Sequence, residues 1–319
     1  MRVVVVGAGA IGSLFGALLL RAGNDVTLVG RPAHVETIAR NGLRIEGRTT
    51  GTYRVRAVAE LPLALEVDLG LLTVKSYDLG AAAEIFGRTV KFPLPVVALQ
   101  NGLGIEAIVE KALRTAGWSD PEQWIVRGIN YVPATYVGPG TVRHAGDGEL
   151  LLADVGPGTH AQSIAEAFRA AGVSARVTTD RDREVWRKVL VNAAILPITA
   201  DHRIPNGRLL LDPYRAQALQ LLDEALSVAG AEGVRFTDTD AQRELWKVVR
   251  ATAENRSSML QDMERGRPTE IDSISGAILE MGRRHGLQLP ATARIVQRIH
   301  SKEPRPDPNG EGAASKGNV

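Results

Sequence analysis

The chain opens with Val3-Val4-Val5-Val6-Gly7-Ala8-Gly9-Ala10-Ile11-Gly12, an apolar run followed at once by a glycine-rich turn. A continuous β-branched run is typical of a strand buried on both faces of a parallel sheet. G-x-G-x-x-G after such a strand indicates a dinucleotide loop: Gly7 permits the turn, Gly9 admits a pyrophosphate, and Gly12 allows close helix packing. A helix expected from residue 11 to 21 would offer its positive end to the phosphates. The candidate phosphate-binding residues are Gly7, Ala8, Gly9, Ala10, Ile11 and Gly12. A glycine turn in another kind of α/β protein is the alternative.

The residues that follow alternate short apolar runs with helical stretches, a pattern typical of a parallel sheet covered by helices. The expected strands are 25–29, 69–73, 96–99 and 124–131, and a helix at 160–171 and a strand at 173–178 close the domain. Segments 42–58 and 141–155 alternate polar and apolar residues around glycines, which predicts antiparallel edge hairpins. The sequence therefore predicts an α/β fold with a Rossmann-type domain over residues 1–179.

From residue 180 the β-rich runs stop, and residues 180–301 predict an all-α domain. A long helix is expected over 183–200, with Pro197 as its kink or its end. Asp212-Pro213 resembles an N-cap followed by a first-turn proline. Further helices are expected near 238–258, 270–285 and 290–301, and the Pro-, Gly- and Ser-containing residues 302–319 are expected to form a disordered tail.

Composition narrows the class of protein. A length of 319 residues favours two domains, and no apolar run approaches the roughly 20 residues that span a bilayer. Met1-Arg2 leads directly into the first strand, so no secretory signal is expected. The absence of cysteine excludes disulfides, thiolate metal sites and a thiol nucleophile. We expect a soluble cytoplasmic protein without a metal site. The net charge of +2, with scattered basic residues, gives no support for nucleic-acid binding.

The end of the second expected strand bears on the choice of cofactor. An acid at this point would bind the ribose 2′-hydroxyl of NAD, but the sequence places Arg31 there, which suits the 2′-phosphate of NADP. An ordinary surface arginine is the alternative reading. Lys75 and Asn101 each follow a later strand, where ligands bind in such sheets, although either residue alone is also common in loops.

Polar residues of the second half are candidates for the chemistry. Lys188 and Asn192 lie four residues apart, so they share a helix face, and the neighbouring apolar residues favour a lysine that gives up its proton. An exposed helix lysine is the alternative. Asn255 and Ser258 lie near an expected helix end, and Glu270 begins the next helix. The alternative for Glu270 is a carboxylate that is only stabilised by the helix dipole at this position.

These segments together resemble one family, the ketopantoate reductases (2-dehydropantoate 2-reductases), from Gly7 to about His300. The resemblance rests on the following segments in this order: 7–12, Thr73-Val74-Lys75, Gln100-Asn101-Gly102, Trp186-Arg187-Lys188 with Asn192, Pro205-Asn206-Gly207, 257–262 and 269–272. The block Ser-Ser-Met-Leu-Gln-Asp at 257–262 is far less generic than the glycine loop. The resemblance implies an NADPH-dependent reductase that converts 2-dehydropantoate to pantoate, on the route to pantothenate and coenzyme A.

The resemblance also implies roles for single residues. Lys188 matches the proton donor, and Glu270 matches a residue at the catalytic end that also contacts the cofactor. Lys75 and Ala134 match cofactor contacts, and Asn101 matches a position near both nicotinamide and substrate. The positions that match substrate contacts are Asn101, Asn192, Asn206, Asn255 and Ser258. Expected partners are a small 2-oxo acid, with neither nucleic acid nor membrane, and a homodimer is compatible with the sequence.

One position departs from the family pattern. Many members have asparagine where this chain has Leu196, within Leu196-Pro197-Ile198-Thr199-Ala200. Leu196 follows Lys188 by eight residues, about 80° around the helix, so we expect it to face the same cleft. A related reductase of a different 2-oxo acid therefore stays an alternative, as does a binding protein that senses NADP(H) without catalysis. The joint presence of Lys188, Asn192, Ser258 and Glu270 argues against the sensor.

Overall fold

The computed structural model describes residues 1–62 and 64–304. The chain divides into two compact units, Met1–Val189 and a second that begins at Leu190. This division falls inside helix α6 (Arg181–His202), later than the boundary at residue 179 that the sequence suggests. The first unit is a mixed α/β domain and the second is helical, as predicted for the fold class.

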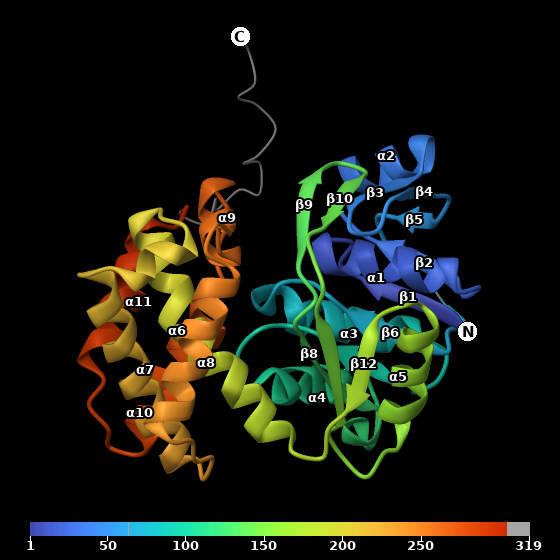
Figure 1. Ribbon diagram of the computed structural model, residues 1–319. Coiled ribbons are helices and arrows are strands. Elements are labelled where there is room, and N and C mark those ends of the chain that lie inside the picture. The colour runs from blue at the N-terminus through green and yellow to red at the C-terminus, as the bar shows by residue number, and fades with distance from the viewer. Residues whose placement is uncertain (63, 305–319) are drawn as a thin grey trace. The chain divides into compact units, whose positions relative to one another are not determined.

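The first unit is built on an eight-stranded sheet with the strand order β12-β11-β8-β7-β6-β1-β2-β5 (Figure 1). The strands are β1 (Arg2–Val6), β2 (Asp25–Val29), β5 (Arg56–Val58), β6 (Leu69–Leu72), β7 (Val96–Ala98), β8 (Ile125–Asn130), β11 (Glu149–Asp154) and β12 (Ser174–Val177). All neighbouring pairs from β5 to β8 are parallel, and β11 runs antiparallel to β8. The predicted parallel sheet is confirmed, with the apolar run Val3–Val6 between two parallel neighbours.

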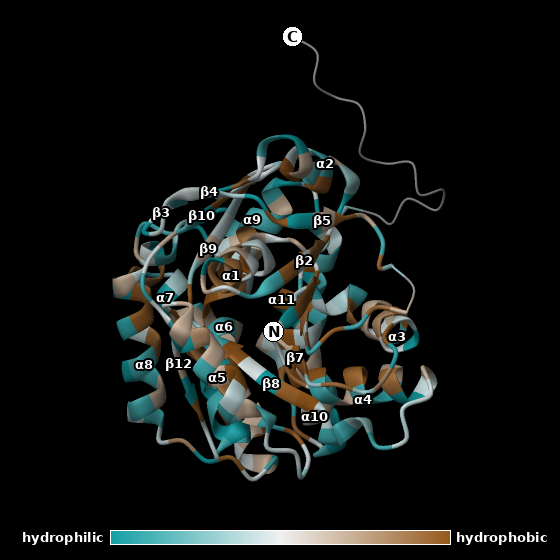
Figure 2. Ribbon diagram, turned by 90° about the vertical axis from the view of Figure 1, so that its right-hand side faces the viewer, coloured by the Kyte–Doolittle hydropathy of each residue, from teal (hydrophilic) through white to brown (hydrophobic). Residues whose placement is uncertain are grey.

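Helices cover both faces of this sheet, which explains why the first strand is apolar throughout. They are α1 (Ala10–Arg21), α2 (Pro32–Asn41), α3 (Leu79–Thr89), α4 (Ile105–Thr115) and α5 (His160–Ala170). Val3 and Val5 belong to a core cluster with residues of α1 and α5, whereas Val4 and Val6 belong to a cluster with α3 and α4. Alternate side chains of one strand thus enter different cores. In Figure 2 the strand β7 is brown, while β8 and α2 each carry both teal and brown.

A second sheet of the first unit has the strand order β4-β3-β10-β9. Its strands are β3 (Leu43–Gly47), β4 (Gly51–Tyr53), β9 (Ala134–Gly138) and β10 (Thr141–His144). The hairpin predicted within 42–58 is present as β3 and β4, but β5 leaves it to pair with β2. The hairpin predicted over 141–155 is wrong, because β10 pairs with β9 and β3 while β11 joins the main sheet. Alternation of polar and apolar residues indicates a half-buried strand, but it does not identify the strand with which that strand pairs.

A buried histidine joins the second sheet to the helices. His34 of α2 is 3% exposed, and its Nδ1 accepts a hydrogen bond from Gly140 N at 2.9 Å. Its Nε2 lies 3.1 Å from the hydroxyl of Ser13 on α1, and its ring packs on Tyr136. An Nδ1 that accepts requires the neutral imidazole with its proton on Nε2. Burial accordingly lowers the pKa of His34 below its ordinary value.

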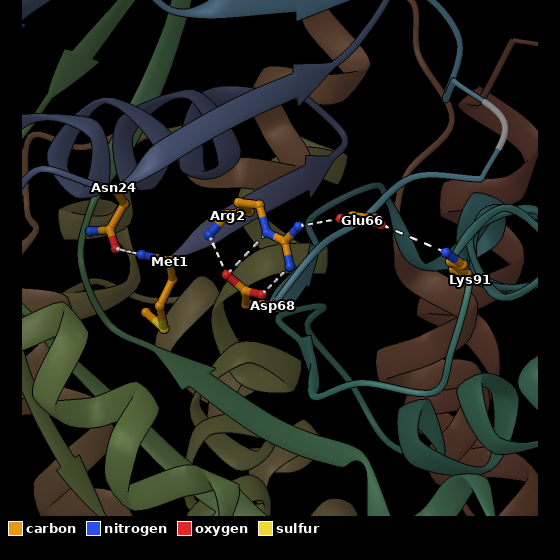
Figure 3. A network of polar contacts seen from close by, with 6 residues as sticks. All are labelled: Met1, Arg2, Asn24, Glu66, Asp68 and Lys91. Carbon is orange, nitrogen blue, oxygen red and sulfur yellow. Dashed lines mark hydrogen bonds and ion pairs between the residues drawn. The ribbon is translucent and has the colours of Figure 1, made fainter.

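The amino ends of the central strands are held by an exposed polar network (Figure 3). The Arg2 guanidinium contacts Asp68 and Glu66, each at 2.8 Å, and Lys91 lies 3.7 Å from Glu66. Arg2 N also donates to Asp68 at 2.7 Å. These bonds from Arg2 lower the pKa of the Asp68 carboxyl. The network fixes the register of β1 against the segment that leads into β6.

The described residues of the second unit form helices joined by turns and loops, with no strand among them. Besides the remainder of α6, its helices are α7 (Tyr214–Ala231), α8 (Asp238–Ala251), α9 (Ser258–Glu264), α10 (Ala277–Arg284) and α11 (Pro290–Lys302). A 3-10 turn covers Asn206–Leu210, and a π-helical turn covers Asp272–Gly276. None of the helices in the described chain is long and apolar enough to cross a bilayer.

Several predicted helix bounds of the second unit need correction. The long helix continues through Pro197, and the helix predicted over 238–258 ends at Ala251. Asp212 is not an N-cap, because Pro213 takes that position and the peptide bond between them is cis. Lys302, where the predicted tail starts, is instead the last residue of α11. Residues 305–319, on which most of that prediction falls, lie outside the described residues.

We predict that His34 makes the first unit less stable in acid. Because its folded pKa is lowered from about 6.5, the unfolded chain takes up the proton first as pH falls. Its contribution is therefore complete above pH 6.5 and decreases below it, by at most about 2 kcal/mol at pH 5. In His34→Asn the amide oxygen can replace Nδ1 without titrating. Urea unfolding at pH 8, 6.5 and 5 should show a smaller acid-side loss for this variant. Equal losses in both proteins would contradict the prediction.

Candidate active site

The carboxyl ends of five parallel strands, ordered β2-β1-β6-β7-β8, meet at one edge of the main sheet. The segments that leave this edge contain the glycine loop, Arg31, Lys75 and Asn101. Ligands of open α/β sheets bind at this edge, where strand ends leave room between loops. The structure thus brings together the cofactor residues that the sequence analysis selected in the first half, apart from Ala134, which begins β9 in the second sheet.

The glycine loop is packed tightly at both ends and open in the middle. A Cβ at Gly7 would lie 2.4 Å from Val74 N, and one at Gly12 would lie 2.3 Å from Gly7 O. A Cβ at Gly9 would meet nothing closer than Gly7 O at 3.9 Å. Gly7 also has a φ of +110°, which favours glycine. The open main chain at Gly9 and the following start of α1 fit a dinucleotide pyrophosphate, which needs close backbone approach and N–H donors.

Arg31 lies at the end of β2, at the N-cap position of α2, and its side chain is exposed. A second charged group, which the sequence motif does not indicate, lies near Arg31. Burial raises the pKa of the Asp78 carboxyl, and the positive charge of Arg31 partly opposes this rise. Asp78 belongs to the 3-10 turn Ser76–Asp78, which follows β6 directly after Lys75. An acidic side chain therefore does lie near Arg31. It comes from the turn after β6 and not from the end of β2, where NAD-binding proteins usually have their acid.

A glutamine joins the loops that carry Lys75 and Asn101. Gln100 is 4% exposed, and its Nε2 donates to Leu72 O at 2.9 Å and to Val74 O at 3.0 Å. Thr73 between these carbonyls donates through its hydroxyl to Gly7 O at 2.7 Å. The three loops are thus bonded to one another, and the half-buried Lys75 and Asn101 project from a connected framework.

Lys188 on α6 lies at the end of β8. Its Nζ donates to the carbonyl oxygen of Asn130 at 2.5 Å and lies 5.4 Å from the ring centre of Tyr131. The side chain of Asn130 bonds both N and O of Val132, which fixes the chain at this point. A carbonyl oxygen and an aromatic face both favour the ammonium form. Beside the apolar neighbours expected from the sequence, these two contacts favour the charged form of the amine.

The other predicted residues lie in the second unit. Asn206 and Asn255 are neighbours, because Asn206 N donates to Asn255 O at 3.0 Å. Asn206 Nδ2 donates to Thr252, while its buried Oδ1 has no hydrogen-bond partner within residues 1–62 and 64–304. Asn192 is half-buried on α6, and Ser258 is the exposed first residue of α9. Glu270 is 7% exposed and precedes the π-helical turn.

The hydroxyl next to Ser258 has a structural role. Ser257 caps α9 by accepting from Leu260 N at 3.2 Å, and its hydroxyl is also hydrogen-bonded to the hydroxyl of Thr199 on α6 at 2.7 Å. Leu196, one turn before Thr199, is 8% exposed. Within the described part of the chain, no group of three or more His, Cys, Asp or Glu residues could hold a metal ion.

Comparisons with known proteins identify relatives that match nearly the whole chain, including all the candidate site residues. The family model "Ketopantoate reductase PanE/ApbA" matches residues 3–157, and its C-terminal counterpart matches residues 180–303. A 2-dehydropantoate 2-reductase of Archaeoglobus fulgidus is 35% identical over 306 residues, covering 95% of this chain and 98% of the relative.

Solved structures agree with these matches. A PanE/ApbA family ketopantoate reductase from Ralstonia eutropha JMP134 superimposes with a TM-score of 0.85 at 32% identity, covering 95% of this chain and 98% of the other. D-mandelate dehydrogenase in a ternary structure with NADH and anilino(oxo)acetate superimposes with a TM-score of 0.88 at 26% identity, with the same coverage.

We predict different effects of a methyl group at two glycines of the loop. Gly9→Ala should leave thermal stability nearly unchanged, because its Cβ has room, yet it should weaken pyridine-nucleotide binding by obstructing the pyrophosphate. Gly12→Ala should lower stability by about 1–3 kcal/mol, because its Cβ collides with main chain. Thermal unfolding and calorimetric titration with NADPH measure the two effects. Undiminished NADPH affinity in Gly9→Ala would show that the pyrophosphate does not lie there.

Proposed function

The chain belongs to the ketopantoate reductase family, and we propose that it reduces 2-dehydropantoate to pantoate with NADPH. The observation that carries the proposal is the position of Lys188, whose Nζ bonds to the end of β8 at the same sheet edge as the glycine loop. The product enters pantothenate and coenzyme A biosynthesis in this proposal. A cytoplasmic location and a homodimer belong to the same proposal, and sedimentation velocity tests the dimer.

Lys188 is proposed to supply the proton of the reaction. When bound, the reduced nicotinamide provides a hydride to the keto carbon, and negative charge develops on the carbonyl oxygen. An ammonium near that oxygen stabilises the charge and then transfers a proton to it. The contacts to Asn130 O and Tyr131 hold the amine as ammonium, the form this role requires.

The remaining predicted residues are proposed to orient the two ligands. The dinucleotide would be held by the loop 7–12, Arg31, Lys75, Asn101, Ala134 and Glu270. The keto acid would contact Asn101, Asn192, Asn206, Asn255 and Ser258, with Glu270 beside the reacting groups. The buried Oδ1 of Asn206 supports this assignment, since a buried polar atom without a partner favours a ligand that can donate to it.

Two observations favour a related reaction as the second candidate. Leu196 places an apolar side chain where many family members have an amide, and D-mandelate dehydrogenase shares the fold at a TM-score of 0.88. A reductase of a bulkier, more apolar 2-oxo acid fits both. A panel of 2-oxo acids, assayed by NADPH consumption at 340 nm, distinguishes the candidates. Ketopantoate should give the largest kcat/KM, and no turnover with any member would favour a non-catalytic NADP(H) sensor.

We predict that Lys188→Ala lowers kcat by roughly 10²–10⁴-fold, the usual contribution of a positioned proton donor. NADPH affinity should stay nearly unchanged, because the proposed phosphate contacts lie on the loop 7–12 and Arg31. The unmodified enzyme should lose activity at alkaline pH, where the ammonium loses its proton, and this limb should be absent in the variant. Lys247→Ala, which removes an exposed lysine of α8, is the control. Near-normal kcat in Lys188→Ala would show that another group donates the proton, and Glu270 would be the next candidate.

The cofactor preference is predicted to depend on Arg31. NADPH should bind more tightly than NADH, and Arg31→Ala should remove about 1.5–3 kcal/mol of that difference, the value of a hydrogen bond to a charged group. Arg40→Ala is a matched control on the same helix, where the arginine pairs with Glu36. Fluorescence titration measures both affinities. Equal affinity of the unmodified protein for the two cofactors would contradict the proposal, and the acid at Asp78 would then explain acceptance of NADH.

A further inference from the structure

A buried arginine lies directly behind the loop that carries Asn101. Arg127 is in the middle of β8, flanked by Val126 and Gly128, and it is only 3% exposed. Its backbone pairs with Ala98 at the end of β7. Strand positions buried in a parallel sheet are ordinarily apolar, so a charged side chain here calls for a specific role.

The guanidinium bonds to the carbonyls of three alternate residues, at the end of β7 and in the loop that follows it. Its Nη1 donates to Ala98 O at 3.3 Å and to Gln100 O at 2.8 Å, and its Nη2 donates to Gly102 O at 3.1 Å. Its Nε lies 3.2 Å from the Glu106 carboxylate in the first turn of α4. The planar guanidinium presents its donors in a fixed geometry, so it sets the directions of these carbonyls as well as satisfying them.

These bonds determine the path of the chain on both sides of Asn101. The carbonyls of Gln100 and Gly102 point to Arg127, and the residue between them is thereby held at a defined position. Gly102 has a φ of +107°, a conformation that the loop keeps only with a glycine and with its carbonyl satisfied. Removal of the guanidinium would leave buried carbonyls without their donor unless the loop changes its shape.

The same framework continues to the cofactor loop. Gln100, whose carbonyl accepts from Arg127, uses its side chain to hold Leu72 O and Val74 O. Between these two, Thr73 bonds to Gly7 O. Hydrogen bonds, linked through the covalent chain at Gln100 and at residues 72–74, therefore connect Arg127 to the Asn101 loop and to the glycine loop.

We infer that Arg127 is a positioning residue that sets Asn101 for the nicotinamide and the keto acid. This inference rests on the proposed function, in which Asn101 contacts both ligands. Arg127 itself acts through the main chain and is not proposed to touch either ligand. Its removal should therefore impair turnover more than it impairs binding of the adenine end of the cofactor, which the loop 7–12 and Arg31 are proposed to hold.

The test compares Arg127→Met with Arg127→Lys. Arg127→Met should lower kcat by roughly 10–100-fold, since a displacement of about 1 Å at a reacting centre has an effect of this size. Affinity for 2′,5′-ADP, a probe of the adenine end, should change by less than about twofold. Arg127→Lys should recover part of kcat, because an ammonium can serve some of the carbonyls but lacks the planar geometry. Arg114→Met, which removes a 51% exposed arginine of α4, is the matched control.

A second readout uses the ligand-free protein and so does not depend on activity. Amide order parameters at Asn101 and Gly102 should fall from about 0.85, the value of rigid backbone, in Arg127→Met. If unmodified protein does not reduce ketopantoate, the proposed function fails, while a fall in these order parameters still supports positioning. If kcat of folded Arg127→Met stays within about twofold of normal and the order parameters are unchanged, the inference is overturned. If Arg127→Met does not fold, Glu106→Gln, which weakens the contact to Arg127 Nε, serves as the test instead. This variant should lower kcat several-fold and lower the order parameters of the Asn101 loop. No change in either quantity would overturn the inference.

Discussion

Close contact between the loop after β1 and the end of β6 is the constraint on which the site depends. No side chain fits at Gly7, because main-chain atoms of Thr73 and Val74 occupy that space, and none fits at Gly12 for a similar reason. The hydroxyl of Thr73 bonds across the contact to Gly7 O. Because the two main chains touch, a shift of one loop forces a shift of the other. The proposed phosphate loop and the loop that carries Lys75 therefore behave as one rigid element.

Most of the fold could be predicted from local sequence pattern. The errors of the prediction lie where a strand pairs with strands that are distant in sequence. Val3–Val6 carries enough information to place a central strand, because its alternate residues enter two different cores. The segment 141–155 shows the limit. Its alternation indicates half-buried strands, but β10 finds its partners at β9 and β3 and β11 finds β8. Burial of alternate residues is a property of one strand, whereas the choice of partner depends on the whole domain.

The candidate site was predictable to a similar degree. Glycine spacing and the ends of strands indicate where ligands approach, and the structure places Arg31, Lys75 and Asn101 at one edge as expected. The groups that hold these residues were not found, because their partners are distant in sequence. Arg127 bonds to carbonyls about 25 to 29 positions earlier, and carbonyl acceptors carry no sequence signal. A charged residue inside an apolar strand, as in Ile125-Val126-Arg127, is the one signal that could have revealed it.

Charged residues have different roles at the amino ends and at the carboxyl ends of the central strands. At the amino edge Arg2 pairs with Glu66 and Asp68 in side-chain contacts that are open to water (Figure 3). Such pairs contribute little free energy each and weaken further with salt. At the carboxyl edge the Arg127 guanidinium is excluded from water, so its bonds are strong and its desolvation is offset only by correct geometry. Buried polar groups of this kind specify one loop conformation, which suits the edge that is proposed to align reacting atoms.

As the proposed proton donor, Lys188 would have to be fixed in place and still be able to donate. Its ammonium contacts Asn130 O, and Asn130 is in turn fixed by its side-chain bonds to Val132. An ammonium carries three N–H donors, so the bond to a main-chain oxygen does not by itself exhaust the group. That bond also opposes loss of the proton until a better acceptor arrives. A substrate oxygen that gains negative charge during reduction becomes such an acceptor, whereas a neutral ground-state carbonyl does not. In the proposed reaction, the contact at the end of β8 would thus favour proton transfer late, when charge has developed on the oxygen.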